Sequence, residues 1–157
     1  MRWAGMTEIT GGSTLDPATV AVGDGGPTVE VEDLSREDFV RYAGASGDFN
    51  PVHYDEPFAR EAGYPSVFAQ GMFTAGVASR FVVDWVGVGV LTSFSTRFAA
   101  QVWPGDSLTV DGSVAAVDRS DDRTTVDIEF SVRSDGEGVV LTGTATSIYP
   151  TAKSPMD

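Results

Sequence analysis

The second half of the chain alternates apolar and polar residues with a period of two, which is the pattern of β-strands that bury one face. Turn-forming Gly, Asp and Ser residues interrupt the alternation at residues 105–106, 120–122 and 135–136. Between these turns the pattern predicts strands over residues 91–99, 108–117, 124–132 and 139–149. Consecutive strands joined by turns pair in antiparallel fashion, so we expect one antiparallel sheet.

A helical pattern precedes these strands. Residues 71–86 are apolar around most of a helical circumference, which predicts a long helix buried on several sides. An earlier helix is expected to begin after Ser35, a favourable N-cap that acidic residues follow, and to bury Phe39, Tyr42 and Ala43. A short strand over residues 28–31 and one or two helical turns over residues 55–61 complete the expected elements.

One early strand, then helices, then a run of strands indicates an α+β domain in which a curled antiparallel sheet of about five strands wraps the long helix. We assign residues 27–150 to this single domain, because 157 residues suffice for one core and no repeat or second core is visible. Residues 1–26, rich in Gly, Thr and Asp, are expected to form a flexible arm, and residues 151–157 a C-terminal tail.

Composition narrows the possible chemistry. The chain has no cysteine and one histidine, which excludes a thiolate nucleophile, a cysteine-based zinc site and a histidine-rich metal site. A net charge of -13 disfavours nucleic-acid binding. There is no secretory signal pattern and no apolar run of about 18 residues, so we expect a cytoplasmic protein without a membrane partner.

The clearest candidate for chemistry is the segment of residues 48–53, which reads Asp-Phe-Asn-Pro-Val-His. A carboxylate and an imidazole at one place can hold a water molecule and move protons near neutral pH. The same residues also make good turns, because Asp and Asn side chains bind nearby backbone and Pro restricts φ. Asp48 and His53 are therefore either a catalytic pair or parts of a capped loop with a half-buried histidine.

The surrounding sequence resembles a known family. Residues 41–58, Arg-Tyr-Ala-Gly-Ala-Ser-Gly-Asp-Phe-Asn-Pro-Val-His-Tyr-Asp-Glu-Pro-Phe, are similar to the hydratase signature of the MaoC-like, (R)-specific enoyl-CoA hydratases. The similarity continues at residues 62–64, 68–72 and 98–106 and covers about residues 30–149. The resemblance implies a hot-dog fold, in which a sheet wraps a long helix.

The resemblance also implies a reaction. Asp48 and His53 would be the catalytic pair, and Asn50 would hold their loop in its active shape. The reaction would be the reversible addition of water to a trans-2-enoyl thioester, which gives the (R)-3-hydroxyacyl product. No metal and no cofactor beyond the coenzyme A or phosphopantetheine of the substrate is implied.

Two positions on the long helix are further candidates. Gly71 begins the helix, where an unpaired backbone N–H and the helix dipole favour an anion, and the family uses the matching glycine as oxyanion donor. Gly71 could instead only permit close packing. Ser79 matches a polar position that the family places near the thioester or the catalytic loop, although a serine in an apolar helix often bonds back to its own backbone.

Thioester carriers bear phosphates, which an acidic protein must bind with local cations. Arg60, Arg80 and Arg97 are the candidates, since guanidinium groups bind phosphate in bidentate fashion. Each of them could equally be a surface ion-pair partner. The sequence does not choose between coenzyme A and acyl-carrier protein as carrier.

The leading hypothesis is therefore an (R)-specific enoyl-CoA hydratase that forms a homodimer or higher homo-oligomer, because a single sheet leaves an edge and an apolar face to cover. The alternatives are a (3R)-hydroxyacyl-ACP dehydratase subunit of fatty-acid synthesis and a non-catalytic hot-dog protein that binds acyl thioesters. Thioester hydrolysis within the same fold is a further alternative.

The charge leads to a prediction about salt. Because the chain has 23 acidic residues and only 10 basic ones, screening by salt should relieve the repulsion between negative charges in the folded state. If the acidity is an adaptation to high salt, the melting temperature will rise strongly between low and molar KCl. A scanning-calorimetry series in KCl measures this, and a melting temperature that does not respond to salt contradicts the adaptation.

Overall fold

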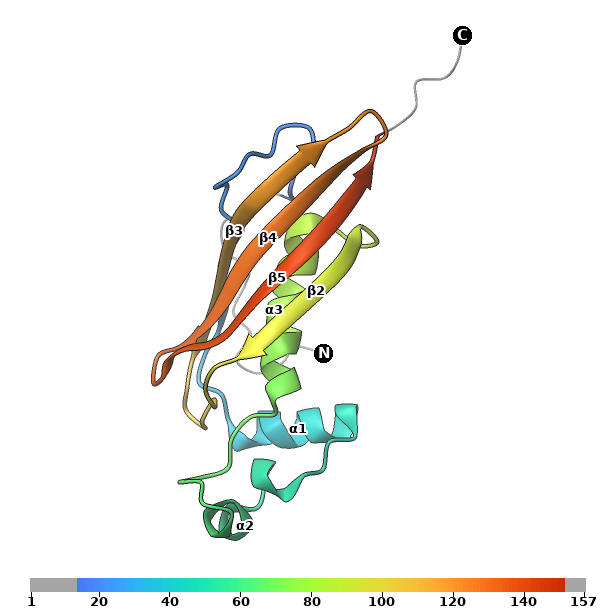
Figure 1. The fold of residues 1–157 in the computed structure, drawn as a ribbon. Coiled ribbons are helices and arrows are strands. Elements are labelled where there is room, and N and C mark those ends of the chain that lie inside the picture. Colours follow the sequence, from blue (N-terminus) through green and yellow to red (C-terminus); the bar gives the residue numbers. More distant parts are fainter. Residues whose placement is uncertain (1–13, 152–157) are drawn as a thin grey trace.

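A five-stranded antiparallel sheet forms the body of the structure, a computed structural model that describes residues 14–151. The strands are β1 (Val29–Val31), β2 (Leu91–Phe98), β3 (Leu108–Arg119), β4 (Arg123–Ser134) and β5 (Gly138–Pro150). Their spatial order is β1-β3-β4-β5-β2, and the sheet curls around a helix (Figure 1). The predicted α+β class is confirmed, and the strands after residue 90 lie within about two residues of their predicted bounds.

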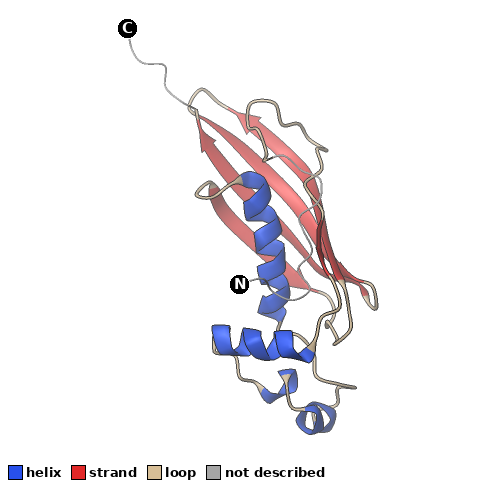
Figure 2. Cartoon of the chain, turned by 180° about the vertical axis from the view of Figure 1, so that it is seen from behind, coloured by secondary structure: helices blue, strands red, loops and turns tan. Residues whose placement is uncertain are grey.

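The long helix α3 (Gly71–Val86) has the predicted bounds and lies along one face of the sheet (Figure 2). Aromatic rings from three elements fill the space between them. The Phe130 ring of β4 stacks on the Phe94 ring of β2, with 5.3 Å between the ring centroids. The centroid of the Phe81 ring of α3 lies 6.5 Å from that of Phe130. Burying one such side chain contributes about 1.5–3 kcal/mol, so this cluster is a major attachment of α3 to the sheet.

One stripe of α3 stays open. Met72, Gly76, Arg80 and Asp84 recur every four residues and are exposed, whereas the opposite side of the helix is buried. The structure differs here from the expected burial on several sides, because within one chain the sheet covers only one side of the helix. No helix within residues 14–151 combines the length and the apolar character needed to span a membrane.

Three shorter helical segments gather beyond the N-terminal end of α3 (Figures 1 and 2). They are α1 (Arg36–Ser46), the 3-10 turn η1 (Pro51–His53) and α2 (Glu56–Glu61).

The helix α1 begins where the sequence predicts. Ser35 and Asp38 form a reciprocal capping box at its start. Gly47 ends it with a φ of 78°, a left-handed conformation that glycine adopts without strain. Phe39 is fully buried and its ring lies 6.3 Å from that of Phe73, so α1 packs against the first turns of α3.

Residues 14–26, which fall within the expected flexible arm, contact the rest of the fold at a few positions. Leu15 and Val20 are buried, and the Leu15 N–H donates to the carbonyl of Trp85 at the end of α3 (2.8 Å). The Gly23 and Gly26 N–H groups donate to β3, beyond the part of β3 that β1 covers. These contacts are long-range, so local sequence could not reveal them. Residues 1–13 and 152–157 lie outside the described range.

Close packing around Gly143 gives a test of the sheet. A Cβ built at this β5 position would lie 2.6 Å from the Ser95 carbonyl oxygen and would overlap the Phe130 ring. Gly143→Ala should therefore lower the free energy of unfolding by about 1–3 kcal/mol, measured by urea denaturation. Gly44→Ala, where a Cβ meets nothing within 4 Å, is the control and should stabilise α1 by about 0.5–1 kcal/mol. Equal midpoints for Gly143→Ala and wild type would contradict this packing.

Candidate active site

The loop that follows α1 is shaped by its own side chains. The Asp48 carboxylate accepts a hydrogen bond from the Asn50 N–H (3.3 Å), and the Asn50 side-chain oxygen accepts one from the Val52 N–H (3.3 Å). Asn50 thereby caps η1, and Pro51 occupies its first position. The expected turn chemistry is present, and it brings Asp48 and His53 to the same side of the loop.

His53 is held by a backbone carbonyl from a distant segment. Its ring is buried, and Nδ1 lies 2.7 Å from the Phe68 carbonyl oxygen. The Phe68 ring contacts the imidazole edge-on at 5.1 Å between centroids. A carbonyl oxygen can only accept a hydrogen bond, so Nδ1 must carry the proton. In the neutral ring the lone pair therefore resides on Nε2.

Nε2 of His53 faces the carboxylate of Asp48. The distance from Nε2 to Asp48 Oδ2 is 3.8 Å, too long for a direct hydrogen bond and suited to two groups that share one water molecule. The His53 side chain is 9% exposed and that of Asp48 46% exposed, so the carboxylate lies at the surface and the imidazole behind it. The pair can accept both hydrogens of a single water.

The start of α3 forms the other part of the site. Gln70 is the N-cap residue but makes no side-chain cap, and the first N–H groups of any helix lack intrahelical acceptors. Gly71 lines a cavity of about 260 Å³ together with Phe68 and Phe98. Because Phe68 also contacts His53, it links this cavity to the loop that carries the Asp48 and His53 pair.

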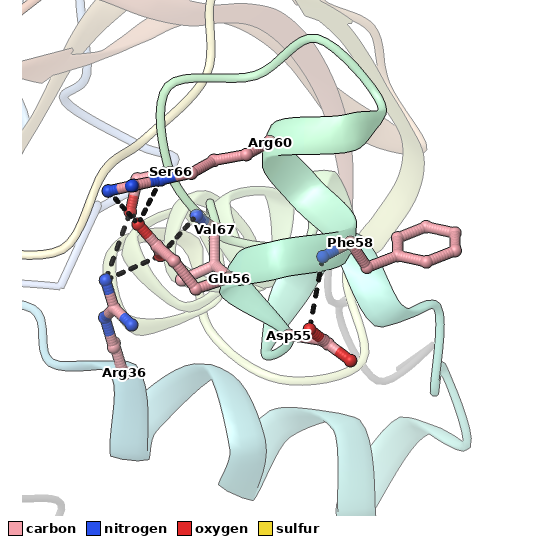
Figure 3. Close-up of polar contacts among 7 residues, drawn as sticks. All are labelled: Arg36, Asp55, Glu56, Phe58, Arg60, Ser66 and Val67. Atoms are coloured by element: carbon pink, nitrogen blue, oxygen red, sulfur yellow. Dashed lines mark hydrogen bonds and ion pairs between the residues drawn. The ribbon is translucent and has the colours of Figure 1, made fainter.

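A third feature is the carboxylate of Glu56, which joins three segments (Figure 3). Its Oε2 accepts hydrogen bonds from Arg36 of α1 (2.7 Å), the Ser66 hydroxyl (3.0 Å) and the Val67 N–H (3.4 Å). Its Oε1 pairs with Arg60.

The contacts keep Glu56 ionised. Desolvation raises the pKa of its carboxyl, but the hydrogen bonds from Ser66 and Val67 and the charges of both arginines outweigh it, so the pKa lies below the ordinary value of 4.5.

The remaining predicted site residues make contacts of other kinds. Ser79 is more than two helical turns beyond Gly71. Its hydroxyl donates to the Gly76 carbonyl of its own helix (2.9 Å), which is the alternative role expected for a serine in an apolar helix. Arg60 pairs with Glu56, and Arg80 pairs with Asp84.

Arg97 points away from the site. It alternates along β2 with Phe98, whose ring faces Gly71, so its side chain leaves the opposite face of the sheet. There it lines a hollow with Ser95 and Thr142. The structure therefore does not bring the candidate phosphate-binding arginines together.

Sequence reasoning missed two contributors, the Phe68 carbonyl and Glu56. A carbonyl has no residue signature, because every residue carries one. Glu56 was visible only as an acidic residue near the start of a short predicted helix, a place where acids are common for local reasons. Its contacts to Arg36 and Ser66 depend on the fold.

Comparison with known proteins identifies the family. Residues 17–136 match the family model of the MaoC-like domain. The chain belongs to the MaoC-like family. The fold agrees, since the (R)-hydratase from A. caviae involved in PHA biosynthesis matches with a TM-score of 0.71 and 25% identity, over 82% of this chain and 96% of that chain. The hot-dog architecture is thereby confirmed.

Two relatives of this MaoC-like chain are dehydratases. The mitochondrial 3-hydroxyacyl-[acyl-carrier-protein] dehydratase of Arabidopsis thaliana is 32% identical over 124 residues, which cover 77% of this chain and 74% of the relative. The 3-hydroxyacyl-thioester dehydratase Y of Mycobacterium tuberculosis is 38% identical over 96 residues, 59% of this chain. The match covers only 33% of that mycobacterial relative's length. By their names these relatives are dehydratases, and this chain shares their family.

Proposed function

We propose that the chain is an (R)-specific enoyl-CoA hydratase, which adds water reversibly to trans-2-enoyl thioesters and gives (R)-3-hydroxyacyl thioesters. The observation that carries the proposal is the 3.8 Å separation between Asp48 Oδ2 and His53 Nε2, with Nδ1 occupied by the Phe68 carbonyl. The family supports the choice of reaction, because its named relatives hydrate or dehydrate.

In the proposed mechanism Asp48 and His53 act on one water molecule. The ionised carboxylate and the Nε2 lone pair each accept one of its hydrogens, which leaves an oxygen lone pair directed at C3 of the enoyl group. The water oxygen bonds to C3 as the pair takes up one of its protons, and a proton from the pair is delivered to C2.

Negative charge develops on the thioester oxygen during this addition and needs a donor. The first N–H groups of α3 and the positive end of its dipole supply one beside the cavity that Gly71 lines. Loss of one such donor costs about 2.7–4 kcal/mol of barrier in other enzymes, which is comparable to the acid-base contribution. The reaction needs no metal ion and no cofactor beyond the carrier of the thioester.

We further propose that the chain assembles as a homodimer. Within residues 14–151, β2 pairs only with β5 and leaves one long edge of the sheet open. Met72, which follows Gly71 on the open stripe of α3, is 62% exposed. Phe98 at the end of β2, whose ring lies beside Gly71, is 48% exposed. A second copy would cover this edge and these side chains.

A second candidate function is dehydration of (3R)-hydroxyacyl groups on acyl-carrier protein. The Arabidopsis relative, which is named for that reaction, matches over most of its own length. The chemistry at the site is the same in both cases, and only the carrier differs. Relative kcat/KM values on coenzyme A and carrier-protein thioesters of the same acyl group decide between the two.

Hydration of crotonyl-CoA, followed by loss of absorbance at the enoyl-thioester band, tests the assignment. Asp48→Asn and His53→Gln should each lower kcat about 10²–10⁴-fold, because the amide that replaces the carboxylate or the imidazole cannot take up a proton from the water. Asp55→Asn is the matched control in the same segment, since Asn replaces Asp well as the N-cap of α2. Full activity in Asp48→Asn, or no turnover by wild type on any enoyl length, would contradict a hydratase. Tight acyl-CoA binding without turnover would indicate a binding protein.

The role of the α3 start is tested with two glycines of the same helix. Gly71→Ala places a methyl group at the cavity, 3.3 Å from the Phe98 ring, and should lower kcat/KM about 10–100-fold by displacing the thioester. Gly76→Ala meets nothing within 4 Å, so it should leave kcat/KM unchanged and stabilise the helix by about 0.5–1 kcal/mol. Equal kcat/KM values in both variants would exclude Gly71 from the oxyanion site.

A further inference from the structure

The segments at residues 53–56 and 66–68 are joined at both ends. At one end His53 Nδ1 bonds to the Phe68 carbonyl (2.7 Å). At the other end the Glu56 carboxylate accepts from the Ser66 hydroxyl (3.0 Å) and the Val67 N–H (3.4 Å). The two links enclose a short ring of chain in which Glu56 lies three residues from His53, and Val67 lies directly before Phe68.

The link at Glu56 is stronger than a surface ion pair. Its side chain is 23% exposed and receives donors from three directions, namely α1, α2 and the loop before α3 (Figure 3). Charge-assisted hydrogen bonds of this kind are roughly twice as strong as neutral ones. Ser66 and Val67 are thus anchored to α2 independently of the contact between Phe68 and His53.

This anchor determines where the Phe68 carbonyl lies. The imidazole tautomer is set by the hydrogen bond that one ring nitrogen makes, and here that bond comes from a loop without secondary structure of its own. If residues 66–68 shift, the ring loses the acceptor that keeps the proton on Nδ1. A proton on Nε2 would point at Asp48, and the pair could no longer accept both hydrogens of one water.

We propose that Glu56 is a positioning residue, which holds the Phe68 carbonyl against His53 and thereby keeps Nε2 of His53 free to accept from water. The catalytic part of the proposal rests on the proposed hydratase function. The structural part, the tautomer of His53, does not depend on any activity.

The chain offers a direct readout, because His53 is its single histidine. Long-range ¹H–¹⁵N correlation spectra of the uniformly ¹⁵N-labelled protein, at a pH where the imidazole is neutral, show which ring nitrogen carries the proton. Wild type should show Nδ1 as the protonated, pyrrole-like nitrogen. In Glu56→Ala a population with the proton on Nε2 should appear, and kcat should fall about 10-fold at unchanged KM because Glu56 does not line the cavity.

Two further variants make the test specific. Ser66→Ala keeps the pairs of Glu56 with Arg36 and Arg60 but removes the loop hydroxyl, so it should shift the tautomer in the same direction and by less. Glu37→Ala removes a helical ion pair with Arg41 on α1 and is the matched control, with tautomer and kcat as in wild type.

The outcomes test the structural part and the catalytic part of the proposal separately. A wild-type tautomer in both Glu56→Ala and Ser66→Ala would overturn it, even if the variants melt at lower temperature, because Glu56 would then serve stability alone. A fall in kcat without any change of tautomer would also overturn it. If no thioester is turned over by wild type, the hydratase function fails, and the spectra still decide whether Glu56 sets the tautomer.

Discussion

The hydrogen bond between His53 Nδ1 and the Phe68 carbonyl is the contact on which the site depends. It joins the loop after α1 to the segment that leads into α3, and so connects the Asp48 and His53 pair to the chain that enters the helix N-terminus. It also determines the chemistry of the imidazole, because a carbonyl acceptor leaves only Nε2 able to accept. A single backbone oxygen thus sets both the position of His53 and its role.

The overall field of the protein is unfavourable to the proposed thioester substrate, whereas local fields at the site are favourable. A net charge of -13 repels the phosphates of any thioester carrier, and the candidate arginines are paired or lie on the outer face of the sheet. The backbone N–H groups at the start of α3 do not depend on net charge, and they act over a few ångströms in a partly enclosed cavity. Stabilisation of the developing oxyanion is therefore compatible with an acidic surface.

The prediction of elements succeeded where local pattern and burial coincide. Strands β2 to β5 and helix α3 have one face on a common core, so alternation and helical periodicity marked them correctly. The sequence did not predict the bonds of residues 14–26 to Trp85 and to β3, because no local pattern encodes such long-range contacts. It was incomplete for α3, since Met72 and Gly76 on its outer stripe do not reveal that one chain leaves them uncovered.

The sequence by itself determined the fold class, the capped loop from Asp48 to His53 and the placement of a glycine at the start of the long helix, because each rests on propensities within a few residues. Only the tertiary structure decided that Asp48 and His53 face each other at 3.8 Å and that the Phe68 carbonyl accepts from Nδ1 of His53. It also decided that Glu56 accepts a hydrogen bond from Ser66, in the loop before α3. It likewise separated Ser79 and Arg97 from the site. The reason is physical: hydrogen bonds across 10 to 15 residues of chain form only after the core between α1, α3 and the sheet has fixed where each segment lies.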